Sequence, residues 1–307
     1  ADKAAVRDAV HSEWAELTGK RRQRRLVLTY ALAASVLVGV FAVFNALRAP
    51  LMETVEVAAI QKTFGPVYLL GDTAELSETH DLTIVMSGQT IVTGDQAGLA
   101  LKWTDGGSLR IDENTRVEFS SDEAIYLKSG RIYFDSRSPV LVAATSASRP
   151  RGFVVHSDHG SMTHVGTQFM ARAEPDTLTV SVREGQVAVD GLYHEHTTSS
   201  GEQLTLAGSQ MPVVLSISSS GQHWSWVERT SPAVNVDGRT LHEYLSWACR
   251  ELGLGLEFEG EAETVARTAI LRGSIDAEPS VALRQRLATA AFSYRIEEGV
   301  IYVSDTP

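Results

Sequence analysis

The chain has 307 residues, a formal net charge of −11 and a single cysteine, Cys249. This length accommodates two domains of about 100–150 residues beside a shorter segment. One cysteine excludes an intramolecular disulfide, so each domain depends on an ordinary apolar core. Seven of the 27 Lys and Arg residues and four of the 38 Asp and Glu residues lie in residues 1–25, which leaves 20 basic against 34 acidic residues in residues 48–307. This acidic balance disfavours direct nucleic-acid binding there, because phosphate binding needs clustered Lys and Arg.

Four apolar side chains in residues 1–25 repeat at the spacing of one helix face. They are Val6, Val10, Trp14 and Leu17. A helix this short cannot bury a tryptophan within itself and is marginal alone in water. The pattern therefore predicts a segment that either lies on the membrane surface or inserts into a groove of a partner protein. The chain starts at Ala1 rather than Met, which leaves open that residues precede it.

Residues 26–48 are predicted to form a membrane-spanning helix. Residues 26–47 contain no charged residue and no histidine, and at 1.5 Å per residue they cover roughly the 30 Å of a hydrocarbon core. A cleaved signal peptide and a buried core helix are the alternatives. Both are disfavoured, because the run is long and uniformly apolar and Arg48 stands where a cleavage site needs small residues. Five basic residues in positions 20–25 place residues 1–25 in the cytoplasm by the positive-inside rule.

Residues 49–207 show the two-residue period of β-strands. Alternating stretches occur at residues 67–69, 109–111, 117–119, 125–127, 132–134 and 180–182. Glycine-containing turn signals separate them, for example Ser129-Gly130 and Glu184-Gly185. Many short strands without a helical period between them predict an all-β domain, in which Leu109 and Ile111 point inward. The pattern does not decide between a sandwich and a coil of short strands.

Five blocks of this region resemble, in the same order, the FecR domain. They are GQTIVTG (88–94), DGGSLRIDENTRV (105–117), LKSGRIYF (127–134), HVGTQF (164–169) and VREGQV (182–187). Glycine supplies positive φ angles at turns, and Asp, Ser and Thr hydrogen-bond the turn backbone. The blocks therefore imply a fold rather than a catalytic site.

Residues 208–230 are predicted to be a Ser-rich linker that ends in Trp224-Ser225-Trp226, an aromatic pair expected to pack on the last domain. In residues 231–307, Thr240 and Glu243 form a predicted capping box at the start of a helix, and Gly253 is its predicted end. Strands are expected at residues 254–258 and 269–275, a helix at 280–291, and a hairpin around Glu298-Gly299. This βαβ-βαβ order, together with the segment LRGS at 271–274, resembles the short N-terminal domain of secretins and TonB-dependent receptors, a docking module of the periplasm.

The sequence predicts no catalytic, cofactor-binding or metal-binding residue. Histidines that invite a metal are His156, His159, His164, His194 and His196. No carboxylate or cysteine stands at a recognised ligand spacing from them, so surface or turn histidines are expected. The motifs of nucleophile elbows, phosphate loops and dinucleotide-binding turns are missing from the sequence, and Cys249 is expected to pack in a helix interface.

The expected fold class is a membrane-anchored multi-domain protein with one transmembrane helix, an all-β FecR-like domain and a small α/β (βαβ-βαβ) domain. The resemblance to FecR proteins implies an anti-sigma-type signal transducer of the bacterial inner membrane, with residues 1–25 cytoplasmic and the later domains periplasmic. It implies two partners, an extracytoplasmic-function sigma factor bound through Val6, Val10, Trp14 and Leu17, and an outer-membrane TonB-dependent receptor, often for ferric siderophores, or another periplasmic protein. The alternative is a membrane-anchored periplasmic scaffold that binds envelope proteins or glycan without signalling.

Overall fold

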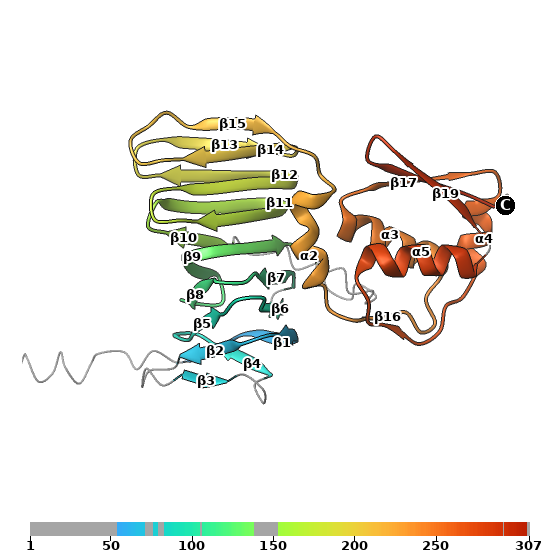
Figure 1. Cartoon of the computed structure of the whole chain (residues 1–307), viewed down its shortest axis with the longest axis horizontal. Coiled ribbons are helices and arrows are strands. Elements are labelled where there is room, and N and C mark those ends of the chain that lie inside the picture. Colours follow the sequence, from blue (N-terminus) through green and yellow to red (C-terminus); the bar gives the residue numbers. More distant parts are fainter. Residues whose placement is uncertain are drawn as a thin grey trace, which may run out of the picture. The chain divides into compact units, whose positions relative to one another are not determined.

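The computed structural model describes residues 54–70, 76–78, 83–104, 106–137, 153–290 and 292–305, within a compact unit that spans Thr54–Pro307 (Figure 1). The predicted stripe of Val6, Val10, Trp14 and Leu17 and the predicted span at residues 26–48 lie outside the described residues. Within the described part of the chain, no helix has the length and apolar character needed to cross a membrane.

The first fifteen described strands form one hydrogen-bonded sheet, here called the β module. They are β1 (Glu56–Phe64), β2 (Val67–Leu70), β3 (Leu76–Glu78), β4 (Ile84–Met86), β5 (Thr90–Thr93), β6 (Gly98–Trp103), β7 (Ser108–Ile111), β8 (Arg116–Phe119), β9 (Ala124–Asp135), β10 (Val154–Ser157), β11 (Gly160–Ala173), β12 (Leu178–Gly191), β13 (Glu195–Ser199), β14 (Glu202–Leu206) and β15 (Val213–Ser216). The main path of pairing runs β15-β14-β12-β11-β10-β9-β7-β6-β1-β4, while β2, β3, β5, β8 and β13 pair beside it. Figure 1 shows these strands stacked one above another.

Long strands of the β module turn corners at glycines. Strand β9 pairs with β8 before Gly130 and with β7 after it, and β12 pairs with β14 before Gly185 and with β13 after it. Gly130, Gly166 in β11 and Gly185 have φ angles of +89°, +61° and +80°, which favour glycine. A Cβ atom at Gly130 would lie 2.5 Å from the Cα atom of Thr115. The module is therefore a coil of strands rather than a simple sandwich, and two predicted turns are corners within continuous strands.

The alternating residues predicted to face the core do so. Leu109 and Ile111 of β7 are fully buried, as are Val117 and Phe119 of β8. The other face of β7 is buried too, with Arg110 only 1% exposed. The outer face of β7 must therefore be covered by another part of the chain.

The segment expected to be a linker, residues 208–230, is folded. It contains β15 and, after it, the short helices η2 (Gln222–Trp224) and α2 (Ser225–Arg229). Trp224 and Trp226 are 0% and 4% exposed and cluster with Tyr133 and Met170 of the β module, not with the last domain as expected. The physical reason is that Tyr133 and Met170 stand on the outer face of the sheet and gain an apolar cover from the indoles.

The remaining elements form a small α/β module. They are β16 (Val234–Asn235), α3 (Leu241–Leu252), β17 (Gly255–Glu259), α4 (Ala262–Thr268), β18 (Ser274–Ile275), α5 (Pro279–Thr289), β19 (Ser293–Glu297) and β20 (Val300–Ser304). The sheet β17-β20-β19 packs its apolar side on the helices, and β16 pairs with β18. Helix α4 was not predicted, and the strand expected at residues 269–275 is reduced to Ser274–Ile275.

Helix α3 begins and ends as the sequence predicts. The Glu243 amide donates to the Thr240 hydroxyl oxygen at 3.1 Å, and the Thr240 amide donates to Glu243 Oε2 at 2.8 Å. Gly253 ends the helix with a left-handed φ of +66°. Gly253 therefore ends α3 directly after the turn that carries Arg250 and Glu251, the residues that contact the β module.

Candidate functional site

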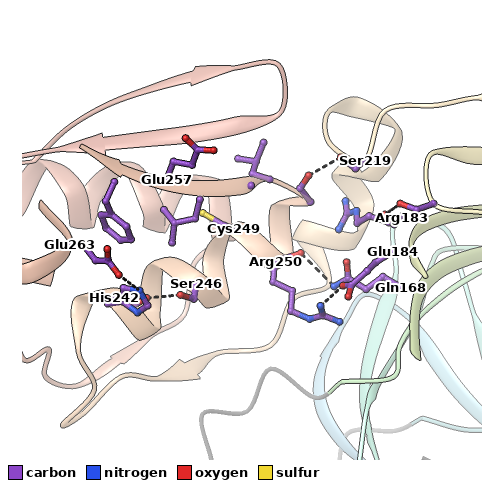
Figure 2. A pocket seen from close by; sticks show the side chains of 16 residues that line it. Gln168, Arg183, Glu184, Ser219, His242, Ser246, Cys249, Arg250, Glu257 and Glu263 are labelled. Atoms are coloured by element: carbon purple, nitrogen blue, oxygen red, sulfur yellow. Dashed lines mark hydrogen bonds and ion pairs between the residues drawn. The ribbon is translucent and has the colours of Figure 1, made fainter. Parts of the chain in front are cut away.

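Six charged side chains meet where α3 contacts the β module, and we call this set the junction. Arg110 on β7, Asp135 on β9, and Arg183 and Glu184 on β12 come from the β module, and Arg250 and Glu251 come from the last turn of α3. Figure 2 shows Arg250 reaching from α3 toward Glu184 and Gln168. Each module contributes both signs of charge, so each supplies cations for the anions of the other.

Glu251 is the centre of the first half of the junction. Its Oε2 accepts a hydrogen bond from Arg110 Nη2 at 2.6 Å, and the two side chains are 3% and 1% exposed. Arg110 also donates from Nη1 to the carbonyl oxygen of Val227 at 2.7 Å. Arg183 donates from Nη1 to the backbone carbonyl of Glu251 at 2.9 Å, where a cation satisfies one of the free carbonyls at a helix C-terminus.

Arg250 forms the second half of the junction, in which the cation comes from α3 and the carboxylates come from the β module. Its Nε lies 3.1 Å from Asp135 Oδ2, and its Nη1 pairs with Glu184. Asp135 is 2% exposed and accepts a further hydrogen bond from Gln168 Nε2 at 2.8 Å. Glu184 is also held by Arg137 at 2.7 Å. The hydrogen bonds that Asp135 accepts from Arg250 and Gln168 compensate this buried carboxylate for its lost hydration.

Aromatic rings take the place of missing hydrogen-bond acceptors around the arginines. Arg183 Nε and Nη2 and Arg110 Nε are buried without a hydrogen-bond partner. The guanidinium carbon of Arg183 lies 4.3 Å from the Trp224 ring centre, and that of Arg110 lies 5.5 Å from the Tyr133 ring centre. Cation–π attraction of this kind is strongest where the pair is removed from water. The two rings therefore stabilise the charges that the carboxylates leave partly unpaired.

Burial and the neighbouring charges shift the pKa values of the junction residues in opposite directions. Burial acts to lower the pKa of Arg110, but Glu251, with Tyr133 and Asp135, raises it further, so the net shift is upward and the guanidinium stays charged. Burial raises the pKa of Asp135 above its ordinary value, although Arg250 and Gln168 pull in the other direction. Breaking such a pair by removing one partner costs more than the pair contributes, because an unpaired buried charge remains.

A further contact joins the junction to the first strand. Lys62 on β1 donates from Nζ to the carbonyl oxygens of Arg229 at 3.1 Å and Ser231 at 3.0 Å. The Ser231 hydroxyl is 3.4 Å from Glu251 Oε2. A continuous chain of polar contacts therefore runs from α3 through Ser231 to β1.

A cavity of about 750 Å³ lies beside the junction, lined by residues of both modules that include Arg183, Glu184, His242 and Cys249. Burial raises the pKa of the Cys249 thiol to about 12, so the thiol stays protonated at neutral pH. Burial, helped by Arg267, lowers the pKa of His242. The cavity therefore presents a neutral thiol rather than a thiolate nucleophile, and Cys249 packs in the α3 interface as expected.

The histidines considered as metal ligands lie in different surroundings. His159 stands in a turn and His156 is exposed, as expected, but His164 is buried at 6% exposure. Its ring centre is 5.0 Å from that of Phe134 and 6.1 Å from that of Phe169, and neither ring nitrogen has a hydrogen-bond partner. Across the described residues, no group of three or more His, Cys, Asp or Glu side chains is arranged to hold a metal ion.

Sequence reasoning found the elements of the junction but none of its charged residues. Arg110 stands between the inward-facing Leu109 and Ile111. A solvent-facing arginine on a strand shows the same alternation, so the pattern does not reveal that Arg110 is buried. One signal was present in α3. Glu251 is an acidic residue in the last turn of a helix, where the helix dipole disfavours it unless a cation is close.

Comparison with known proteins assigns the β module. Residues 89–188 match the family model described as FecR protein, from β5 to β12. The match identifies this third of the chain as a FecR domain. The match supports the general class of FecR-type regulators.

Comparisons of the whole chain are less informative. No curated protein sequence matches it. Crystal structures of a proposed anti-sigma factor from Parabacteroides distasonis ATCC 8503, at 1.65 and 2.50 Å, cover 71% of this chain and 99% of their own, with 16% identity and a TM-score of 0.36. A TM-score this low does not establish a common arrangement, and nothing about this protein's partners follows from it.

The Arg110 and Glu251 pair predicts a non-additive effect on stability. Arg110→Met leaves Glu251 buried without its cation and should lower the free energy of unfolding by about 3–5 kcal/mol. Adding Glu251→Gln removes the orphaned charge, so the double variant should be more stable than Arg110→Met alone. Denaturant unfolding followed by tryptophan fluorescence measures both, since Trp224 and Trp226 lie beside the pair. If the double variant loses as much stability as Arg110→Met and Glu251→Gln lose together, the two residues are not coupled and the assignment is wrong.

His164 predicts an acid-sensitive core. Burial lowers its pKa from 6.5 to about 4, so the unfolded chain binds a proton in this window that the folded chain does not. Stability is then full above pH 6.5 and falls as the pH drops toward 4, by about 3 kcal/mol in total at 1.36 kcal/mol per pKa unit. His164→Phe should flatten this pH dependence of the unfolding free energy. The exposed control His156→Phe should leave it unchanged, and an equal effect of the two variants would disprove the origin.

Proposed function

We propose that the protein is an anti-sigma-type signal transducer. Residues 26–48 anchor it in the bacterial inner membrane, residues 1–25 bind an extracytoplasmic-function sigma factor in the cytoplasm, and the described modules lie in the periplasm. There the α/β module receives a signal from a TonB-dependent receptor or another envelope protein. The match of residues 89–188 to the FecR family model and the charge distribution around residues 26–48 support this proposal.

The observation that carries the proposal is the junction. A docking event on the α/β module can affect the β module only if the two are mechanically connected, and a flexible linker would not connect them. Here the connection consists of buried ion pairs in both directions, with Arg110 and Glu251 almost inaccessible to water. Packed elements joined in this way transmit displacements rather than absorb them.

The contacts of Lys62 supply a route toward the membrane. Glu251 contacts Ser231, and Lys62 of β1 binds the carbonyl of Ser231. Strand β1 is the described strand nearest in sequence to the predicted span. A shift of α3 relative to the β module would alter the partners of Lys62, and we propose that this alters how β1 holds the chain that leads to residues 1–25.

The output is tested at Trp14. A tryptophan in a segment too short to bury it within itself has apolar surface worth roughly 2 kcal/mol or more on burial, and tryptophan often dominates an interface. Trp14→Ala in the full chain should therefore abolish co-purification of a sigma factor from the native host, identified by mass spectrometry, while membrane insertion stays normal. Glu13→Ala is the matched control, because Glu13 lies off the apolar stripe, and it should leave capture unchanged.

Two outcomes would contradict the proposal. If Trp14→Ala and Glu13→Ala capture the sigma factor equally well, the stripe of Val6, Val10, Trp14 and Leu17 is not the binding surface. If the unaltered chain recovers no sigma factor while envelope proteins co-purify, the protein is instead a membrane-anchored periplasmic scaffold.

A further inference from the structure

Strand β15 is an unprotected apolar edge at one end of the β module. It pairs with β14, and it is the last strand in the main path of the sheet (Figure 1). Val213 and Leu215 are each 53% exposed, Val214 is 39% exposed and Met211 is 76% exposed. Val214 stands opposite Leu204, which is fully buried, so the core continues to the edge and ends there uncovered.

The composition around β15 is as unusual as its exposure. Residues 203–227 contain no Asp, Glu, Lys or Arg, in a chain of which 21% of residues are charged. Stacked-strand proteins normally end in polar or charged strands, because an open edge of apolar residues pairs with other strands. Pro212 shortens the edge at one end but leaves the rest of β15 available. An apolar edge of this kind is expected to have a partner.

The register shows which backbone groups are free. The Ile217 amide donates to the Gly201 carbonyl at 2.8 Å, and Leu215 and Val213 stand opposite Gln203 and Thr205. In an antiparallel ladder alternate residues bond the same neighbour, so Ile217, Leu215 and Val213 bond toward β14. The amide and carbonyl groups of Val214 and Ser216 therefore point away from the sheet.

These free groups are complementary to their own copy. We propose that β15 pairs antiparallel with β15 of a second copy of this chain, around a two-fold axis at Leu215. Val214 of one chain then stands opposite Ser216 of the other, and each pair exchanges two backbone hydrogen bonds. On one face Leu215 meets Leu215, and Val213 meets Ile217, which forms an apolar ladder. The absence of charge in residues 203–227 means that no like charges oppose the pairing.

One strand pair is a small interface. It falls below the roughly 1,200 Å² of total area that stable interfaces bury, so the dimer is weak and forms at high protein concentration. A heterologous strand would also fit the free groups, but the two-fold register is specific to a second copy. That register distinguishes the two cases in an experiment.

Cysteine cross-linking of the full chain in detergent tests the register. In a non-hydrogen-bonded antiparallel pair the Cα atoms lie about 4.5 Å apart, within the range of a disulfide. Leu215→Cys should thus yield a disulfide-linked dimer under mild oxidation. Val213→Cys is the matched control, because its exposure is the same but its own copy lies about 14 Å away, four residues along the ladder. The unaltered chain, whose buried Cys249 is the background, should remain uncross-linked.

A second measurement does not depend on a disulfide. In sedimentation the unaltered chain should gain mass with concentration, and Leu215→Arg should remain monomeric because two like charges meet at the axis. Leu215 is an exposed side chain, so the Leu215→Arg variant should retain its fold. Equal cross-linking of Val213→Cys and Leu215→Cys, or a monomer at every concentration of the unaltered chain, would overturn the proposal.

Discussion

The buried pair of Arg110 and Glu251 determines how the described part of this protein is built. Arg110 occupies the outer face of β7, so that face can be buried only if a carboxylate arrives to neutralise it. Glu251 does so from the last turn of α3, and Arg183 binds the carbonyl of the same residue. The α/β module is thereby fixed at one place on the β module, and the Trp224 ring of the connecting segment packs on the Arg183 guanidinium.

The junction holds the α/β module against the β module, which contains the FecR match. Buried ion pairs contribute little net stability compared with apolar packing, but they penalise every arrangement in which one partner is unpaired. The junction therefore sets a specific orientation. It also allows few intermediate positions, which suits a protein proposed to pass a binding event from one module to the other.

The sequence predicted what depends on local pattern. Alternation placed Leu109 and Ile111 in the core, and the Thr240 capping box and Gly253 bounded α3. The sequence did not predict which part of the chain covers the outer face of β7. Period-two alternation indicates one buried face and leaves Arg110 on the face expected to contact solvent. The linker prediction for residues 208–230 failed for a related reason. The Ser-rich composition of this segment gave no signal for β15. Trp224 and Trp226 pack on strands that are distant in sequence, which a local pattern does not indicate.

The junction should make the two modules one cooperative unit in unfolding. Native-state hydrogen exchange of the full chain, followed by mass spectrometry at rising denaturant, measures the opening free energy of peptides from β7 and from α3 separately. The two values should converge on one global value, with α3 protected as strongly as β7. Exchange of α3 at a distinctly lower free energy, while β7 stays protected, would show that the α/β module unfolds by itself and that the junction does not couple the modules.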